Sequence, residues 1–253
     1  MVSNRLLKGL LWMFVLSFAM LPATGILFAC PTLQLDIEGG TYDLTTQTII
    51  GDDSFTLYAY LIPDGSNTLS DEYYISAALV PMVTTESELG SFDFDGDTVN
   101  VTEDMVYGVP PLETIIASDP KDLPTHGIYE TYFWEYEFQF DEDNEIAEYD
   151  TQDRAESGDS IPASGDGMYY VAFTIDTSLL DTDYVIHFDL YNTKVKCSGD
   201  IDVTQFAPFS HDAESSHPVP EPKTFILLGI GLLGLGIYGL YGRRKSRTEK
   251  KRK

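Results

Sequence analysis

Strong bases are almost missing from the middle of this 253-residue sequence. Residues 30–222 hold four lysines and arginines against 40 of the chain's 41 aspartates and glutamates, so this segment carries a net charge of −36. A surface this negative repels nucleic-acid phosphates and anionic lipids. We therefore expect no nucleic-acid partner, and solubility is the simplest role of the charge.

The motifs that accompany common catalytic and metal sites are missing too. The four histidines show no HExxH or other metal-binding spacing, and the chain has neither a GxSxG nucleophile motif nor a phosphate-binding loop. His187 and Asp189 share one face of a predicted strand, but without a GxSxG motif a strand-surface histidine is the simpler interpretation. Glu135 and Glu137 also share a face, but acids are so abundant here that such pairs arise by chance. We expect that the protein is not an enzyme, and a glycan hydrolase is the third-ranked function.

Cysteine is scarce, with only Cys30 and Cys197 near the two ends of the central segment. Export would place both in a compartment where disulfides form. A bridge would close a loop of over 160 residues, and such a closure stabilises a fold by about 4–5 kcal/mol in the chain-entropy model. The alternative is lipid attachment at Cys30, because Leu27-Phe28-Ala29-Cys30 resembles a lipobox, although Phe28 is bulky where a small residue is usual.

Helical periodicity is missing from the central segment, and alternation of apolar and polar residues takes its place. Thr131 to Phe140 is the clearest case, with aromatic residues at every second position and acids between them. Strands are predicted at 33–38, 54–61, 72–80, 131–140, 168–176 and 184–191, with weaker ones at 46–50, 98–102 and 200–204. Short strands and acidic, glycine-rich turns predict an all-β fold, an antiparallel β-sandwich or jelly roll.

Two features of this segment raise the question of a ligand. The run that contains Asp93, Asp95 and Asp97 is a candidate calcium loop, although it has Thr98 and Asp104 where an EF-hand has glycine and glutamate. Five tyrosines lie on faces opposite the main apolar ones, where rings can stack on sugars: Tyr58, Tyr60, Tyr74, Tyr170 and Tyr191. The simpler interpretations are a solvated acidic turn and partly covered second faces. Calcium thus stays an open cofactor, and a calcium-assisted carbohydrate-binding module is the alternative function.

The two ends of the sequence carry the long apolar runs and most of the positive charge. Residues 1–29 predict a secretory signal peptide, with Arg5 and Lys8 before an uncharged apolar run. A second apolar run at about 224–242 just reaches the length of one transmembrane helix. A basic cluster follows the second run at once and stays on the cytoplasmic side of a membrane, and it begins with Arg243, Arg244, Lys245 and Arg247.

A short proline motif, Pro220-Glu221-Pro222, directly precedes this second apolar run. The motif, the helix and the basic tail together resemble the PEP-CTERM sorting signal over about the last 35 residues. The two prolines favour an extended backbone, which would present Glu221 to a binding groove. The resemblance implies recognition by exosortase, a membrane protease-transpeptidase that removes the helix and tail, and a Gram-negative host that makes extracellular polysaccharide. The alternative is an ordinary C-terminal anchor with a helix-breaking linker.

The central segment resembles the choice-of-anchor N family of bacterial ectodomains. The resembling stretches are PTLQLDIEGGTYD (31–43), SFTLYAYLIP (54–63), GIYETYFWEYEFQFD (127–141), MYYVAFTIDTS (168–178), YVIHFDLYNTK (184–194) and FAPFSHDAESS (206–216). The family implies a domain that is paired with varied C-terminal anchors, and it implies no catalytic residue. The expected organisation is a signal peptide at 1–29, an ectodomain at 30–205, a linker at 206–219 and the sorting signal at 220–253.

The leading functional hypothesis is an exported surface or extracellular-matrix protein with a structural or adhesive role. It would cross the inner membrane, stay anchored there by its C-terminal helix with a cytoplasmic tail, and reach the cell surface after exosortase acts. Exosortase, the inner membrane and extracellular polysaccharide are the expected partners.

The positive tail makes a testable prediction about topology. A reporter that is active only in the periplasm, fused after Lys253, is expected to stay inactive, because the basic cluster holds that end in the cytoplasm. The same reporter fused at residue 216, before the sorting motif, is expected to be active. Activity of the fusion after Lys253 would contradict the predicted orientation.

Overall fold

The computed structural model describes residues 30–112, 130–195 and 201–216. The predicted signal peptide, Cys197, the sorting motif, the apolar C-terminal run and the basic tail lie outside these residues. Within the described part, no helix has the length and hydrophobicity needed to cross a membrane.

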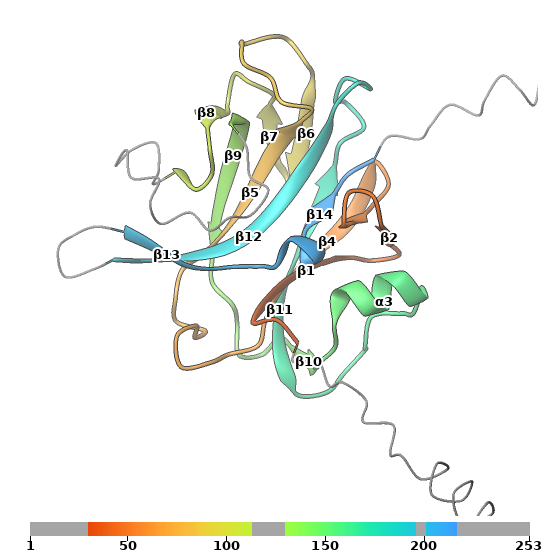
Figure 1. The fold of residues 1–253 in the computed structure, drawn as a ribbon, viewed down its shortest axis with the longest axis vertical. Coiled ribbons are helices and arrows are strands. Elements are labelled where there is room, and N and C mark those ends of the chain that lie inside the picture. The colour runs from red at the N-terminus through yellow and green to blue at the C-terminus, as the bar shows by residue number, and fades with distance from the viewer. Residues whose placement is uncertain (1–29, 113–129, 196–200, 217–253) are drawn as a thin grey trace, which may run out of the picture. The chain divides into compact units, whose positions relative to one another are not determined.

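The described residues form two β-sheets, which we call sheet A and sheet B (Figure 1). Sheet A contains, in spatial order, β1 (Leu33–Ile37), β4 (Ser54–Leu61), β11 (Gly167–Asp176), β6 (Ser91–Phe94) and β7 (Asp97–Asn100), with β10 (Glu145–Ala147) paired to β11. Sheet B contains β2 (Thr41–Asp43), β3 (Thr48–Ile50), β14 (Ala213–Glu214), β12 (Val185–Val195), β5 (Tyr73–Val80), β9 (Thr131–Phe138) and β8 (Val106–Gly108), with β13 (Ile201–Phe206) paired to β12. Among the described strand pairs, β3 with β14 is parallel and the others are antiparallel.

The core lies between the inner faces of the two sheets, because alternate side chains of each strand point to one face. Phe94 from sheet A illustrates the packing: its ring centroid lies 5.2 Å from that of Trp134 and 5.0 Å from that of Tyr136, both on β9 of sheet B. Phe173 and Phe188 pack on the same ring at 5.1 and 6.4 Å. The aromatic alternation therefore predicted the inner face of β9 correctly, and the prediction of an all-β sandwich is confirmed.

Two segments outside the strands predicted from the sequence contain ordered elements. The polar stretch 141–167 contains β10 and helix α3 (Thr151–Ser157). The prediction of a linker that begins at residue 206 is wrong, because β13 ends at Phe206 and the domain continues beyond it. The segment contains a 3₁₀ helix, η2 (Phe209–His211), and strand β14, which pairs with β3 and β12. These elements escaped prediction because strands of two or three residues show no periodicity.

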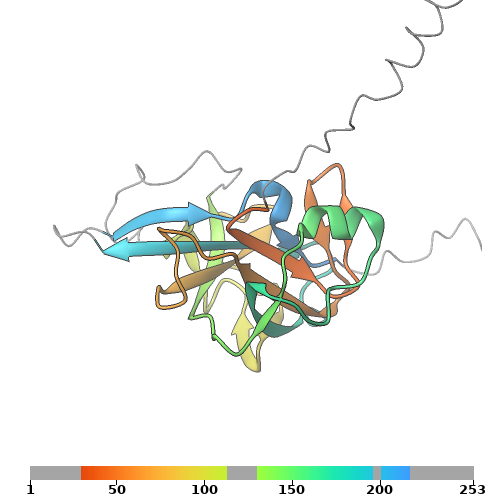
Figure 2. The same cartoon turned by 90° about the horizontal axis from the view of Figure 1, so that it is seen from below.

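Helix α3 begins and ends with standard capping residues. The side chain of Asp150 accepts a hydrogen bond from the backbone N–H of Asp153 at 3.0 Å, and Gly158 closes the helix with φ of +71°. The helix contacts β1 of sheet A and β2 of sheet B, and Figures 1 and 2 show it beside these strands. It therefore spans the two sheets at one edge of the sandwich.

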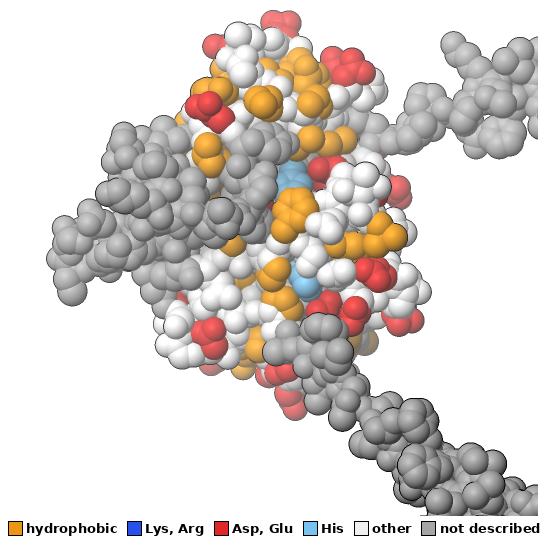
Figure 3. All heavy atoms as spheres, viewed as in Figure 1, with side chains coloured by type: hydrophobic (Ala, Val, Ile, Leu, Met, Phe, Trp, Pro, Cys, Tyr) orange, Lys and Arg blue, Asp and Glu red, His pale blue; other side chains and the backbone are white. Residues whose placement is uncertain are grey.

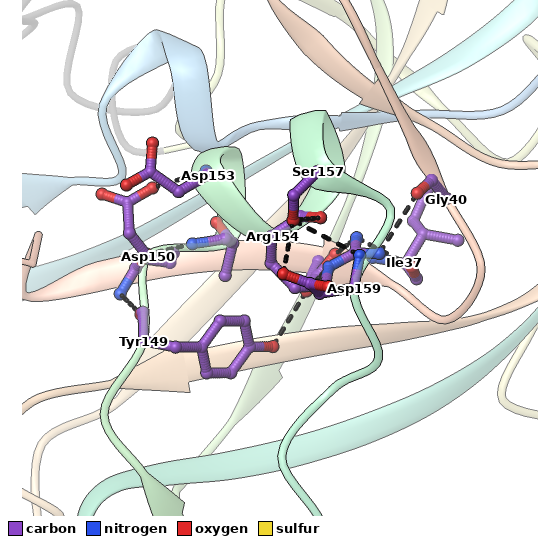
Figure 4. A network of polar contacts seen from close by, with 11 residues as sticks. Ile37, Gly40, Tyr149, Asp150, Asp153, Arg154, Ser157 and Asp159 are labelled. Carbon is purple, nitrogen blue, oxygen red and sulfur yellow. Dashed lines mark hydrogen bonds and ion pairs between the residues drawn. The ribbon is translucent and has the colours of Figure 1, made fainter.

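A buried ion pair fixes this helix to sheet A (Figure 4). The Arg154 guanidinium donates to both carboxylate oxygens of Asp36, with Nε 2.9 Å from Oδ2, and also to the backbone carbonyl of Gly40 at 3.2 Å. The hydroxyl of Tyr149 donates to Asp36 Oδ2 at 2.8 Å. Because Asp36 is fully buried, these donors replace the water that its charge loses on folding.

Removal of the arginine is expected to leave a buried charge behind. We predict that Arg154→Met lowers the free energy of unfolding by about 3–5 kcal/mol, because Asp36 would lose its cation inside the protein. The urea midpoint of the purified protein measures the change.

Glu156→Ala, at an exposed position of the same helix, is the matched control and is expected to shift stability by less than about 0.5 kcal/mol. The double variant Asp36→Asn with Arg154→Met should recover part of the loss. Equal midpoints for Arg154→Met and the control would contradict a stabilising role for the pair.

Candidate functional site

A group of polar side chains lies on the outer face of sheet B, opposite the core. On β12, Ile186, Phe188 and Leu190 point into the core, so His187, Asp189 and Tyr191 point to the other face. The strand register sets their neighbours: His187 pairs with Glu214 of β14, and Asp189 pairs with Ser76 of β5. Cross-strand pairing thus brings together residues that are far apart in the sequence.

His187 is surrounded by three carboxylates. Its Nε2 lies 3.5 Å from Asp189 Oδ1 and 3.8 Å from Asp212 Oδ2, while its Nδ1 lies 3.4 Å from Glu214 Oε2. Asp212 reaches this face because it precedes Ala213, which points into the core, so that residues 212 and 214 share the outer side. We call these four residues, His187, Asp189, Asp212 and Glu214, the histidine–carboxylate cluster.

The two aspartates of the cluster are buried. Asp189 is 2 % and Asp212 0 % exposed, whereas the side chain of His187 retains 15 %. Burial alone would lower the pKa of His187, but Asp189, Glu214 and Asp212 outweigh it and raise that pKa above its ordinary value. Burial and the neighbouring Asp189 also raise the pKa of Asp212. The cluster is therefore a site of strongly coupled charges, a property that functional sites share with buried structural ion pairs.

A second group of polar side chains lies on the same outer face, nearer to β9. The Tyr191 hydroxyl donates to Glu135, and the backbone N–H of Leu112 donates to Glu135 Oε2 at 2.9 Å. Ser76 Oγ donates to Asp189 Oδ2 at 3.1 Å, and Ser76 is the register partner of both Asp189 and Glu135. The two groups thus meet at Ser76.

Three atoms of the cluster have the spacing that a metal ion requires. One ligand atom each from His187, Asp189 and Asp212 lies within 4.8 Å of the others, and this is the one such group among the residues that the structure describes. Figure 3 shows the described surface of one face, with scattered acidic side chains and the two described histidines. The arrangement offers one imidazole nitrogen and two carboxylate oxygens.

Asp93, Asp95 and Asp97, the predicted calcium ligands, lie in the hairpin that joins β6 and β7. Asp95 and Gly96 have φ of +50° and +92°, and Phe94 pairs with Asp97, so they form a two-residue hairpin turn of the type that favours Asp-Gly. Asp93 accepts a hydrogen bond from Thr98 Oγ1 at 2.6 Å. The described structure does not bring the carboxylates of Asp93, Asp95 and Asp97 into a common ligand group. Turn chemistry explains this acidic run, and calcium binding there stays a prediction.

The five tyrosines do not form one exposed row. Tyr60 and Tyr191 are fully buried, so the described structure does not offer them as a surface for sugars, while Tyr58, Tyr74 and Tyr170 are half-buried. On sheet A, Tyr60 packs under Tyr149, with ring centroids 5.4 Å apart. The outer face of sheet A is thus partly covered, as its apolar residues indicated. Cys30 lies at the start of the described residues and is half-buried, and its predicted bond to Cys197 stays a prediction.

Sequence reasoning found part of the cluster and missed the rest. The shared face of His187 and Asp189 is visible in the sequence, but it is interpreted there as a strand-surface histidine beside an acid. Asp212 and Glu214 are not connected with this pair at the level of sequence, because they lie in the segment taken as a linker. A polar–apolar–polar run of three residues, Asp212, Ala213 and Glu214, is too short to predict a strand, so the sequence contains no local signal for this part of the cluster.

Comparison with known proteins gives a match at the C-terminal end of the sequence, outside the described residues. Residues 218–245 match the family model described as the PEP-CTERM protein-sorting motif. No curated protein matches the chain. The match covers Pro220, Glu221 and Pro222, the apolar run and the first basic residues, and it supports an exported protein that exosortase sorts and processes. The signal also implies a stage at which the C-terminal end is anchored in the membrane.

The hydrogen bond between Tyr191 and Glu135 gives a testable prediction. Tyr191→Phe is expected to lower the free energy of unfolding by about 1–3 kcal/mol, because Glu135 would lose a donor in a largely buried position. The shift of the urea midpoint measures it. Tyr184→Phe, at a half-buried position on the adjoining segment, is the control and should change little. A Tyr191→Phe midpoint equal to that of the control would contradict the prediction.

Proposed function

We propose that the β-sandwich is the exported cargo of the sorting signal and has a structural or adhesive role at the cell surface or in the extracellular matrix. The observation that carries this proposal is the match to a sorting motif at residues 218–245, directly after the last described strand at Ala213–Glu214. A domain placed so close to such a signal is the part that remains outside the cell after the helix and tail are removed.

The surface of the domain is consistent with this role. Its charge of −36 over residues 30–222 keeps copies hydrated and apart in a dilute medium. A matrix rich in divalent cations would screen or bridge these carboxylates and bring the copies together. We therefore propose a non-catalytic protein that contributes charge and bulk to a matrix.

Extracellular polysaccharide is the partner that we propose for this matrix. The half-buried rings of Tyr58 and Tyr170 lie 6.0 Å apart on the outer face of sheet A and offer a small aromatic surface for a sugar. The resemblance of the ectodomain to the choice-of-anchor N family agrees with a domain that is displayed by different anchors. A host that makes extracellular polysaccharide would supply both the sorting enzyme and the matrix.

Recovery of the protein from the host tests this proposal. The mass of the wild-type protein released with the surface polysaccharide is expected to show a C-terminus near Pro222. The variant Pro220→Ala with Pro222→Ala is expected to keep its tail to Lys253 and to stay in the membrane fraction, because the extended motif would be lost.

Pro218→Ala, which leaves Pro220, Glu221 and Pro222 intact, is the control and should behave as the wild type. A deletion strain should also attach less well to a surface coated with the host's polysaccharide, and only the wild type and the control should restore attachment. Wild-type protein with an intact tail in the matrix would contradict processing. Unchanged attachment of the deletion strain would contradict the structural or adhesive role.

A further inference from the structure

The distances within the histidine–carboxylate cluster are longer than those of direct hydrogen bonds. His187 Nε2 lies 3.5 Å from Asp189 Oδ1 and 3.8 Å from Asp212 Oδ2. Both separations exceed the roughly 2.7–3.2 Å of a good N–H···O hydrogen bond. Two ligands that are each about 2.1 Å from a tetrahedral metal ion lie roughly 3.4 Å apart. The spacing therefore fits ligands that share an ion better than it fits a pair of direct hydrogen bonds.

Charge leads to the same conclusion. Nε2 of an imidazole carries at most one hydrogen and directs one short hydrogen bond at a time. Two buried carboxylates nevertheless converge on it, Asp189 from β12 and Asp212 from the residue just before β14. Asp189 and Asp212 are 2 % and 0 % exposed, so both have lost nearly all of their contact with water. A buried carboxylate is stable when it is paired or coordinates a metal. A divalent cation would contact both carboxylates and the imidazole at the same time.

The contacts around the three ligand atoms are those that hold metal ligands in place. Glu214 Oε2 lies 3.4 Å from His187 Nδ1, so that Nε2 is turned toward the two aspartates. Ser76 Oγ donates to Asp189 Oδ2 at 3.1 Å, while Asp189 Oδ1 is the oxygen that faces His187. A carboxylate behind a ligating histidine and a hydroxyl behind a ligating carboxylate are typical outer contacts of metal sites. Strands β12 and β14 hold the backbones of His187, Asp189 and Glu214, and Ser76 lies on the neighbouring β5. Asp212 directly precedes β14, and its backbone carbonyl accepts a hydrogen bond from the N–H of Ile49 at 3.0 Å.

We propose that His187, Asp189 and Asp212 bind one divalent transition-metal ion of the zinc class, with Glu214 and Ser76 as positioning residues. An imidazole nitrogen with two carboxylate oxygens is a ligand set that zinc accepts, whereas calcium takes oxygen ligands. Three protein ligands leave a fourth position for water or another group. The side chain of His187 is 15 % exposed, which gives an ion a path from solvent on that side.

The competing account is an ion pair in which a protonated His187 alone balances the carboxylates. That account needs no metal and predicts that added metal finds only the many surface acids. The two accounts differ in stoichiometry and in which substitutions matter, so metal binding by the whole chain separates them.

Equilibrium dialysis of Zn²⁺ tests the proposal. The full chain, purified in detergent without a histidine tag and stripped with a chelator, is dialysed against Zn²⁺ in excess Ca²⁺, which occupies surface carboxylates. We expect one tightly held Zn²⁺ per chain beyond the amount bound by His187→Gln and by Asp212→Asn. Zn²⁺ should also raise the melting temperature of the wild type but not that of these variants.

Two further variants sharpen the result. Glu214→Gln is expected to weaken Zn²⁺ binding about 10- to 100-fold without abolishing it, as loss of an outer contact does. Asp97→Asn, which removes an exposed acid of the β6–β7 turn, is the matched control and should bind as the wild type. Circular dichroism of each variant shows whether the sheet has formed, and the wild-type titration stands even if one variant fails to fold.

The outcomes are decisive in both directions. A stoichiometric Zn²⁺ that is lost in both ligand variants and kept in Asp97→Asn supports the site. Absence of tight Zn²⁺ in the wild type overturns it, and so does equal binding by the wild type, His187→Gln and Asp212→Asn. Failure of this test would leave the sorting and surface role untouched, because neither depends on a metal ion bound at this cluster.

Discussion

The ion pair between Arg154 and Asp36 is the interaction on which one whole edge of the sandwich depends. Arg154 is one of two strong bases in the described part of the chain, and its guanidinium meets a fully buried carboxylate on β1. Through this contact α3 is held against sheet A, and Tyr149 is held over the outer face next to Tyr60. A neutral side chain at position 36 could pack there, but the charged one requires this helix in this place. The pair is thus better understood as a constraint on geometry than as a large gain in stability.

Other buried and half-buried acids lie beside histidines. Asp150 meets His211 at 3.2 Å, so the capping residue of α3 also connects the helix to η2. Asp189, Asp212 and Glu214 gather around His187. With so few lysines and arginines in the described residues, histidine side chains lie beside these carboxylates instead. Three carboxylates around one imidazole exceed what a single proton can balance, which is why the cluster on sheet B differs from the pairs at α3.

Both sheets are covered on their second faces, and this links the fold to the proposed role. The outer face of sheet A carries tyrosines that pack on each other and under Tyr149, and the outer face of sheet B carries the polar groups that meet at Ser76. What remains for solvent is mainly acidic loops and turns, such as the Asp95-Gly96 hairpin. A domain of this kind presents mainly charge to its surroundings, and most of its aromatic rings are buried, with half-buried tyrosines such as Tyr58 and Tyr170 as exceptions. This agrees with the proposed role of a displayed protein whose sorting signal lies in a separate segment of the chain.

The sequence by itself determined the sorting signal, the all-β class and the inner face of strands with clear alternation, such as β9. It could do so because a sorting signal is read as a linear motif, and because burial of one strand face imposes a period of two over eight or more residues. Tertiary structure alone decided which polar residues meet. The register of β12 against β5 and β14 set His187 beside Glu214 and Asp189 beside Ser76, and β14 was too short to show any period. Pairing between distant segments is fixed by packing of the whole core, so a local pattern cannot contain it.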